Sequence, residues 1–377
     1  MTTPRLASAT LLLLLAGQAA PAQDPAPAPA PTEAKAQAPK AAGPVKEEGG
    51  FTEPRRGDVP EGAAEQVTPE ADQAINSGLA WLAKQQNADG SFGSGAYRGS
   101  IAVTSLAGLA FMGNGSSPGR GPFGTHVDKA LQYIMDNTDP RSGFIAVPNA
   151  ATHGPMYSHG FGALFLAEAY GMSRRPELRE KLAKSIRLII DTQNKEGGWR
   201  YQPVRNDADI SVTICQINAL RAARNAGLYV PKETVDGCIR YVKQAQNPDG
   251  GFRYMSQSGP SAFPRSAAGV VALYSAAVYD AKEVDQGISY LKQFMPEIKF
   301  GQRYNHYFYG HYYAAQAMWI RGGEDWNVWF PAIRDELIRR QLPGGYWQES
   351  GVCNEYGTAM ALIIMQMPNN YLPIFQR

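Results

Sequence analysis

One short phrase recurs along this chain: a helix that ends in Gln, a turn rich in Gly with Asp, Glu or Pro, and then an aromatic residue. It reads QQNADGSFG from residue 85, TQNKEGGWRY from residue 192 and AQNPDGGFRY from residue 245, with weaker copies NTDPRSGF and RQLPGGYW. The aromatic positions are Phe92, Phe144, Trp199, Phe252 and Tyr346, and a degenerate copy near Phe300 fills the one double step. A period of about 50 residues indicates that one supersecondary unit is repeated along the chain.

Each repeat is predicted to hold two helices, one on either side of the turn. The first helix is amphipathic. In the first repeat it begins at Thr68-Pro69, a hydroxyl cap followed by proline in the first turn. Apolar residues then recur at helical spacing until Gly90, which tolerates the left-handed conformation that ends helices.

The second helices carry few charges and many Ala and Gly residues, a composition typical of helices buried on most sides. Their expected ranges are 100–112, 157–171, 209–223, 266–278, 306–319 and 354–367. Six outer and six inner helices in alternation predict an all-α fold, an α6/α6 toroid of twelve helices closed in a ring. An open solenoid is the alternative, and polar capping repeats at both ends would indicate it.

The turn phrase has a structural interpretation. Gln is expected to bond the free carbonyls at the end of its helix, Gly permits the reversal, and the aromatic side chain packs between neighbouring repeats. The phrase would then hold repeats together and carry no chemistry.

The chain outside the repeats is expected to direct export. Residues 1–22 resemble a secretory signal, with Arg5, a short apolar core and a small-x-small cleavage site. Residues 23–66 are rich in Pro, Ala and charge and are predicted to form a disordered tether, followed by the toroid at 67–377. We therefore expect a periplasmic or extracellular protein, without a transmembrane segment because the apolar run is too short.

The charge of the chain gives no indication of a nucleic-acid partner. The formal net charge is +2 and the basic residues are scattered, so a nucleic-acid partner is not expected.

The chain contains three cysteines, and all of them lie in apolar helical contexts: Cys215, Cys238 and Cys353. Three inert buried thiols are favoured over one disulfide and a free thiol.

The Gln-x-x-Asp-Gly-x-Trp/Phe phrase resembles the repeat shared by squalene and oxidosqualene cyclases and by the β-subunits of protein prenyltransferases. The resemblance covers the chain from about residue 68 to its end and recurs in register. It implies a terpenoid cyclase-type toroid, here a divergent single-domain exported member. Related toroids of the complement type carry a thioester segment that this sequence lacks.

The resemblance implies one candidate catalytic group. Class II cyclases use an Asp-x-Asp-Asp motif at the start of an inner helix, and Asp207 and Asp209 match its first two acids. Asp209 would fall on the general acid, but Ile210 replaces the third acid and removes a polar neighbour that strengthens it. The alternative for Asp209 is a plain helix N-cap.

The prenyltransferase side of the resemblance implies a zinc site that is incomplete here. His311 resembles the zinc-binding His, but the preceding inner helix has neither the Asp nor the Cys. No metal or other cofactor is therefore expected.

In a toroid the inner helices begin on one rim, so residues distant in sequence converge there. The candidate ligand-binding residues at this rim are Tyr157, His159, Arg265, Tyr304, His306, Tyr309, His311, Glu355 and Tyr356, with His153 nearby. Three interpretations of these residues compete. In the first, an aromatic cavity holds an isoprenoid or other lipid, and its expected lining is Phe161, Phe165, Tyr307, Phe308 and Tyr312. In the second, His side chains bind a divalent metal together with Asp209 and Glu355, and in the third the side chains form a packed core and satisfy one another's hydrogen bonds.

The favoured hypothesis is an exported toroid that binds an apolar ligand, such as an isoprenoid, in its central cavity. Three alternatives stay open. They are a terpene-cyclase-like isomerase with Asp209 as general acid, a non-catalytic interaction scaffold with a protein partner, and a secreted polysaccharide-active enzyme with Asp209 and Glu355 as paired carboxylates.

Overall fold

The chain folds into helices joined by turns and loops. The computed structural model describes residues 59–148, 151–173, 175–296 and 306–376, and these ranges contain no β-strand. The expected signal and most of the tether, the repeat copy near Phe300 and Tyr304 lie outside the described residues. The twelve α-helices are α1 (Pro69–Lys84), α2 (Ile101–Gly113), α3 (Gly124–Asp136), α4 (Pro155–Tyr170), α5 (Pro176–Thr192), α6 (Ile210–Asn225), α7 (Lys232–Gln244), α8 (Phe263–Ser275), α9 (Lys282–Lys292), α10 (Tyr307–Arg321), α11 (Gly323–Arg340) and α12 (Asn354–Met365).

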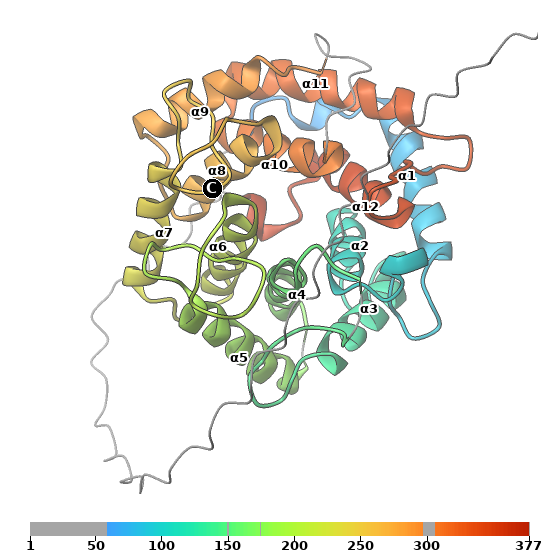
Figure 1. Cartoon of the computed structure of the whole chain (residues 1–377). Helices are drawn as coiled ribbons and strands as arrows, with labels where there is room; N and C mark the ends of the chain where they lie inside the picture. Colours follow the sequence, from blue (N-terminus) through green and yellow to red (C-terminus); the bar gives the residue numbers. More distant parts are fainter. Residues whose placement is uncertain (1–58, 149–150, 174, 297–305, 377) are drawn as a thin grey trace, which may run out of the picture. The chain divides into compact units, whose positions relative to one another are not determined.

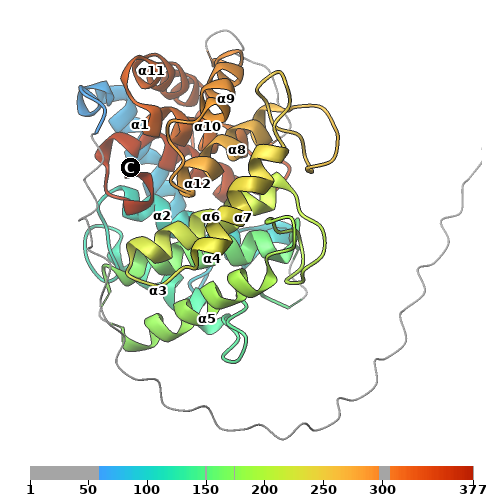
Figure 2. The same cartoon turned by 90° about the vertical axis from the view of Figure 1, so that its left-hand side faces the viewer.

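The helices form two concentric rings. Each even-numbered helix packs against the next one, and α12 packs against α2, so the inner ring is closed. The odd-numbered helices lie outside this ring, and the outer ring closes where α11 contacts α1 (Figure 1). The view at a right angle shows the outer helices α3, α5 and α7 across the face of the inner ones (Figure 2). This arrangement confirms the α/α toroid and excludes the open solenoid.

The inner helices are buried on nearly all sides, as their composition predicts. In α2 every residue except Ala102 is buried, and in α10 every residue except the last. The expected bounds hold to within a few residues, and the largest difference is at α8, which begins at Phe263 with Pro264 in its first turn. Proline needs no hydrogen-bond acceptor there, so the helix starts before the first residue of the expected range.

The turn glutamines connect successive outer helices. Gln341 donates from Nε2 to the Gly345 carbonyl at 3.0 Å and to the Ala74 carbonyl of α1 at 2.8 Å, which ties the last repeat to the first. Gln86, Gln193 and Gln246 make the same two bonds, each to its own turn glycine and to the next outer helix. For these four glutamines, the expectation that Gln bonds the carbonyls of its own helix end was therefore wrong. The turn packs against the backbone of the next outer helix, as at Gly345, where a Cβ atom would lie 2.8 Å from the Ser77 carbonyl oxygen, so the carboxamide reaches a carbonyl of that helix.

The turn glycine is required by two constraints at once. Gly197 has φ of +104°, a conformation that L side chains rarely adopt. A Cβ atom at this position would lie 2.0 Å from the backbone oxygen of Gly237 in α7. The turn therefore packs backbone against backbone at the junction between repeats.

A hydrogen bond from the inner helix defines the true register of the repeat. The side chains of Thr104, Thr213, Ser266 and Thr358 accept the backbone N–H groups of Phe92, Trp199, Phe252 and Trp347, at distances of 2.8–3.1 Å. In the second repeat His159 Nδ1 accepts from the Ile145 N–H at 3.1 Å. Ile145 and Trp347 are fully buried, so the equivalent positions lie one residue after the expected Phe144 and Tyr346. Tyr346 instead stacks on Trp81, with ring centroids 4.8 Å apart.

The C-terminal segment, residues 367–376, covers the carboxyl ends of the inner helices. Trp319 of α10 donates to the Phe375 carbonyl at 3.0 Å, and Arg221 of α6 donates to the Gln376 carbonyl. Glu168 of α4 accepts the Ile374 N–H at 3.4 Å. Access to the middle of the ring is therefore from the amino ends of the inner helices.

The structure bears on the state of the cysteines and on the expected absence of a membrane-spanning helix. Cys215, Cys238 and Cys353 are buried and form no disulfide, in agreement with three inert thiols. Among the described residues, no helix has the length and apolar character needed to span a bilayer.

Candidate functional site

A cavity of about 1370 Å³ lies where the inner helices begin. Aromatic side chains form much of its wall: Tyr97, Tyr157, Phe161, Tyr201, Tyr254, Tyr307, Phe308, Tyr309, Trp347 and Tyr356. They come from inner helices and from the segments between each turn and the inner helix that follows it. All six copies of the repeat therefore contribute aromatic residues to the wall of one cavity.

Five of the nine expected ligand-binding residues line this cavity, namely Tyr157, Arg265, His306, Tyr309 and Tyr356. His153 also lines it, with Nδ1 3.1 Å from the Tyr97 hydroxyl. Its ring lies 6.5 Å from that of His306 between centroids. Of the aromatic residues expected at the cavity, Phe161, Tyr307 and Phe308 line it, whereas Phe165 and Tyr312 do not.

His159 lies in the packing between helices and does not line the cavity. It is fully buried, and its Nε2 donates to the Ser185 carbonyl of α5 at 3.1 Å while Nδ1 accepts from Ile145. Burial lowers the pKa of His159 to about 4, so the ring stays neutral with one donor and one acceptor. His159 thus accepts the backbone N–H of Ile145 in the second repeat, as the Thr213 side chain accepts that of Trp199 in the third.

His311 has the same position in α10, five residues after the N-cap, as His159 has in α4. Its ring packs against Phe263 at 4.9 Å and against Trp329 of the outer helix α11 at 6.3 Å, and burial lowers its pKa to about 3. Its Nδ1 atom has no partner among the described residues.

The two expected carboxylates also lie away from the cavity. Glu355 of α12 is buried and accepts from the Ser94 hydroxyl at 2.9 Å. Asp209 is fully buried at the start of α6. Within the described residues, no three His, Cys, Asp or Glu side chains are grouped to hold a metal ion.

Asp209 caps α6, as the structural alternative predicted. Its Oδ1 atom accepts the Val212 N–H at 2.9 Å, and its Oδ2 atom accepts from the Tyr254 hydroxyl at 3.3 Å. Arg200 Nε lies 3.9 Å from Oδ2. Burial outweighs these stabilising contacts and raises the pKa of Asp209 to about 6. A carboxyl with this pKa is protonated below about pH 6 and largely ionised at about pH 7.

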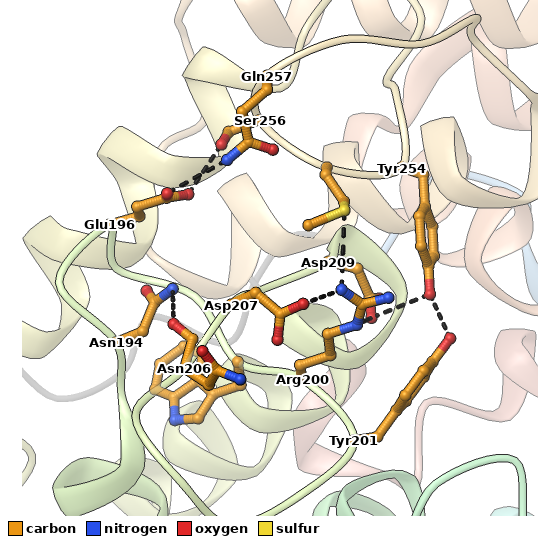
Figure 3. Close-up of polar contacts among 12 residues, drawn as sticks. Asn194, Glu196, Arg200, Tyr201, Asn206, Asp207, Asp209, Tyr254, Ser256 and Gln257 are labelled. Carbon is orange, nitrogen blue, oxygen red and sulfur yellow. Dashed lines mark hydrogen bonds and ion pairs between the residues drawn. The ribbon is translucent and has the colours of Figure 1, made fainter. Parts of the chain in front are cut away.

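Two loops cover Asp209, and both follow a turn phrase (Figure 3). Arg200 forms an ion pair with the half-exposed Asp207 and also lies over the ring of Tyr201, 5.1 Å from its centroid. Glu196 joins the loops by accepting from the Ser256 hydroxyl at 2.8 Å. Asp207 therefore fixes Arg200 beside the buried acid.

Two tyrosines stand between Asp209 and the cavity. The hydroxyls of Tyr201 and Tyr254 are hydrogen-bonded to each other, and both side chains line the cavity (Figure 3). These residues were not expected at the site, although the sequence carries a signal for them. The third and fourth phrases both end in Arg-Tyr, at Arg200-Tyr201 and Arg253-Tyr254.

Comparison with known proteins identifies relatives of this fold. The model of the prenyltransferase alpha-alpha toroid domain matches residues 70–185 and 172–306, together more than half of the chain. Drimenyl diphosphate synthase of Streptomyces showdoensis is 27% identical over 193 residues, which are 50% of this chain and 33% of that enzyme. The match thus spans about a third of the length of this relative.

Solved structures show the same architecture at low sequence identity. A type II terpene cyclase from Scytonema, in complex with geranylgeranyl dihydroxybenzoate, has a TM-score of 0.56 and 13% identity, covering 82% of this chain and 99% of that one. An inactive variant of an α-1,6-mannanase from Salegentibacter, in complex with α-1,6-mannotriose, has a TM-score of 0.58 and 8% identity, covering 80% and 99%. At such identities the likeness is evidence of fold alone.

Proposed function

Because this chain belongs to the prenyltransferase alpha-alpha toroid family, we propose that its central cavity binds an apolar ligand of the isoprenoid class. The observation that carries the proposal is the cavity of about 1370 Å³ with its largely aromatic wall. Ligand pockets are usually about 300–1,000 Å³ and largely apolar, so this cavity has room for a long hydrocarbon chain. Burying such a chain yields about 25 cal/mol per Å² of apolar surface.

The relatives favour the same ligand class. The cyclase from Scytonema was solved with a geranylgeranyl compound, and the Streptomyces relative is a drimenyl diphosphate synthase. Residues 1–22 further lead us to propose that the protein acts after export. A ligand taken up in the periplasm or outside the cell would enter at the amino ends of the inner helices, since residues 367–376 cover the other ends.

A second candidate function is protonation-initiated cyclisation with Asp209 as the acid. The specific observation in its favour is a buried carboxyl whose pKa, about 6, lies well above its ordinary value, so that it remains protonated up to about pH 6. The proton would pass to an alkene carbon, leave a carboxylate and a carbocation, and be replaced when the cation loses a proton, so the net reaction is an isomerisation. Two observations weaken this candidate: Ile210 replaces the third acid, and Asp209 does not line the cavity in which the alkene would lie.

Polysaccharide cleavage is less well supported. Glycosidases hold two carboxyl groups about 5–9.5 Å apart on either side of the scissile bond. Neither Asp209 nor Glu355 lines the cavity, and Glu349 is the one carboxylate among the described residues that do.

Native mass spectrometry of the full chain, with squalene and farnesol as probes, tests the proposed function. Ala102 is a half-buried residue of α2 at the cavity wall, so the indole of Ala102→Trp should project into the cavity, occupy part of it and weaken probe binding. Ala80→Trp is the matched control, because Ala80 lies on the exposed face of α1. We expect one bound probe in the wild type and the control, and a smaller bound fraction in Ala102→Trp.

The possible outcomes separate the alternatives. Equal binding by Ala102→Trp would place the ligand elsewhere and refute the cavity. Binding of α-1,6-mannotriose in place of both isoprenoids would favour the polysaccharide alternative. Binding of none of these compounds would favour an interaction scaffold.

A further inference from the structure

A chain of hydrogen bonds leads from the buried acid to the cavity wall. The Tyr254 hydroxyl donates to Asp209 Oδ2 at 3.3 Å, and it is also bonded to the Tyr201 hydroxyl. Both tyrosines line the cavity, whereas Asp209 does not. Apart from Tyr254, the Tyr201 hydroxyl has no hydrogen-bond partner within the described residues.

The direction of the hydrogen bonds between Asp209, Tyr254 and Tyr201 depends on whether Asp209 is protonated. When Asp209 is ionised, Tyr254 donates to it and Tyr201 donates to Tyr254, so Tyr201 offers only its oxygen lone pairs to the cavity. When Asp209 is protonated, the carboxyl donates to Tyr254 and Tyr254 donates to Tyr201. The Tyr201 proton is then free for a ligand atom that accepts a hydrogen bond.

We propose that Tyr201 binds a neutral oxygen atom of the ligand, and that Asp209, acting through Tyr254, decides whether the Tyr201 hydroxyl donates or accepts. The proposal rests on the proposed cavity function and names its ligand class: an isoprenoid with a hydroxyl, ether or carbonyl group. Tyr201 is the residue that touches the ligand, and Tyr254 and Asp209 position its proton.

Among the titratable groups around the hydrogen-bonded tyrosines, Asp209 is the one whose protonation state changes around pH 6. The other titratable groups that act on it electrostatically are Arg200 with its partner Asp207 in the covering loop, Tyr254, Tyr241 of α7, Tyr157 of α4, Cys215 of α6 and Tyr309 of α10. Burial raises the pKa of each of these tyrosines and of the Cys215 thiol, so all of them stay neutral. Arg200 stays cationic, and the pKa of Asp209, about 6, means that both forms of the carboxyl are populated around that pH.

Three probes with the same hydrocarbon chain test the proposal: farnesol, farnesyl methyl ether and farnesene. The ether oxygen only accepts, so its binding requires the protonated form of Asp209. Its affinity should fall by about 10- to 100-fold between about pH 5 and about pH 8, because the competent fraction falls while the loss is limited to one hydrogen bond. Farnesol can accept or donate, and its affinity should change by less than about threefold.

Three variants test the direction of the hydrogen bonds between Asp209, Tyr254 and Tyr201. In Asp209→Asn the cap oxygen is retained, and the Nδ2 group faces Tyr254 as a permanent donor. The ether should then bind equally well across this pH range. Tyr254→Phe removes the hydroxyl that links Asp209 to Tyr201, so ether binding should no longer depend on pH. The matched control Tyr229→Phe removes an exposed hydroxyl, and ether binding should depend on pH as in the wild type.

Every outcome bears on the proposal. Farnesene binding as tightly as farnesol and the ether at every pH would leave the cavity function standing and refute the oxygen site. An ether affinity that is independent of pH in the wild type, or still pH-dependent in Asp209→Asn, would refute the switch. Failure of all three probes to bind would refute both the proposed function and this inference.

Discussion

Replacing Asp209 with Asn should change how the stability of this protein depends on pH. The wild-type carboxyl is fully buried, and its pKa is about 6 in the folded chain against an ordinary value of 3.8. Each pKa unit is worth about 1.4 kcal/mol, so ionisation of the folded form costs about 3 kcal/mol. Asn retains the hydrogen bond to the Val212 N–H and does not ionise.

The direction of the effect follows from which state binds the proton. Below about pH 4 the carboxyl is protonated in both the folded and the unfolded chain. Between about pH 4 and about pH 6 the unfolded chain releases the proton while the folded chain retains it, so the free energy of unfolding of the wild type falls as pH rises. Above about pH 6 both states are ionised and the loss is complete.

Urea denaturation of the two proteins at about pH 4 and about pH 7.5 measures this difference directly, because all other titrating groups cancel. The stability of Asp209→Asn relative to wild type should rise by about 2.4 kcal/mol over this range, somewhat less than the full value of about 3 kcal/mol because the unfolded chain is already partly ionised at about pH 4. Ser100→Ala is the control: Ser100 is the neutral N-cap of α2, and its loss should cost about 1 kcal/mol at both pH values. A stability difference between Asp209→Asn and wild type that does not change with pH would show that the acid is not held neutral by burial.

Two further substitutions test ring closure and the role of the buried His. Gln341→Ala removes the two bonds that join the last repeat to the first, to Gly345 and to Ala74, and should lower the free energy of unfolding by about 1–3 kcal/mol in urea denaturation. His159→Ala leaves the buried Ile145 N–H without an acceptor and should cost about 2 kcal/mol or more, while farnesol affinity of the folded protein stays within about twofold.

Each of these substitutions has a matched control within the chain. Gln85 donates only to Trp81 in its own helix, so Gln85→Ala should cost less than Gln341→Ala. An equal loss for both would argue against Gln341 as a closing contact. His153 lines the cavity, so His153→Ala should weaken farnesol binding with little loss of stability. The reverse pattern, with binding lost in His159→Ala and retained in His153→Ala, would contradict the assignment of the two residues.

The candidate site was only partly predictable from the sequence. The rim residues Tyr157, Arg265 and His306 were found because inner helices must begin on the same side of the ring. His159 was assigned to the same rim, but one position along a helix turns a side chain by about 100°, enough to move it from the cavity to the packing between rings. The period of the repeat gives positions along a helix and does not say which face meets the cavity.

The sequence by itself determined the closed ring of twelve helices, because that result depends on local signals written several times: the caps, the turn glycines and the apolar inner helices. Only the tertiary structure decided how Asp209 behaves. Its pKa depends on burial, on Arg200 and on the Tyr254 hydroxyl, and Tyr254 lies 45 residues away in the next repeat. Desolvation and hydrogen bonding act over a few ångströms of space, and the neighbours that supply them are brought together only when the repeats pack.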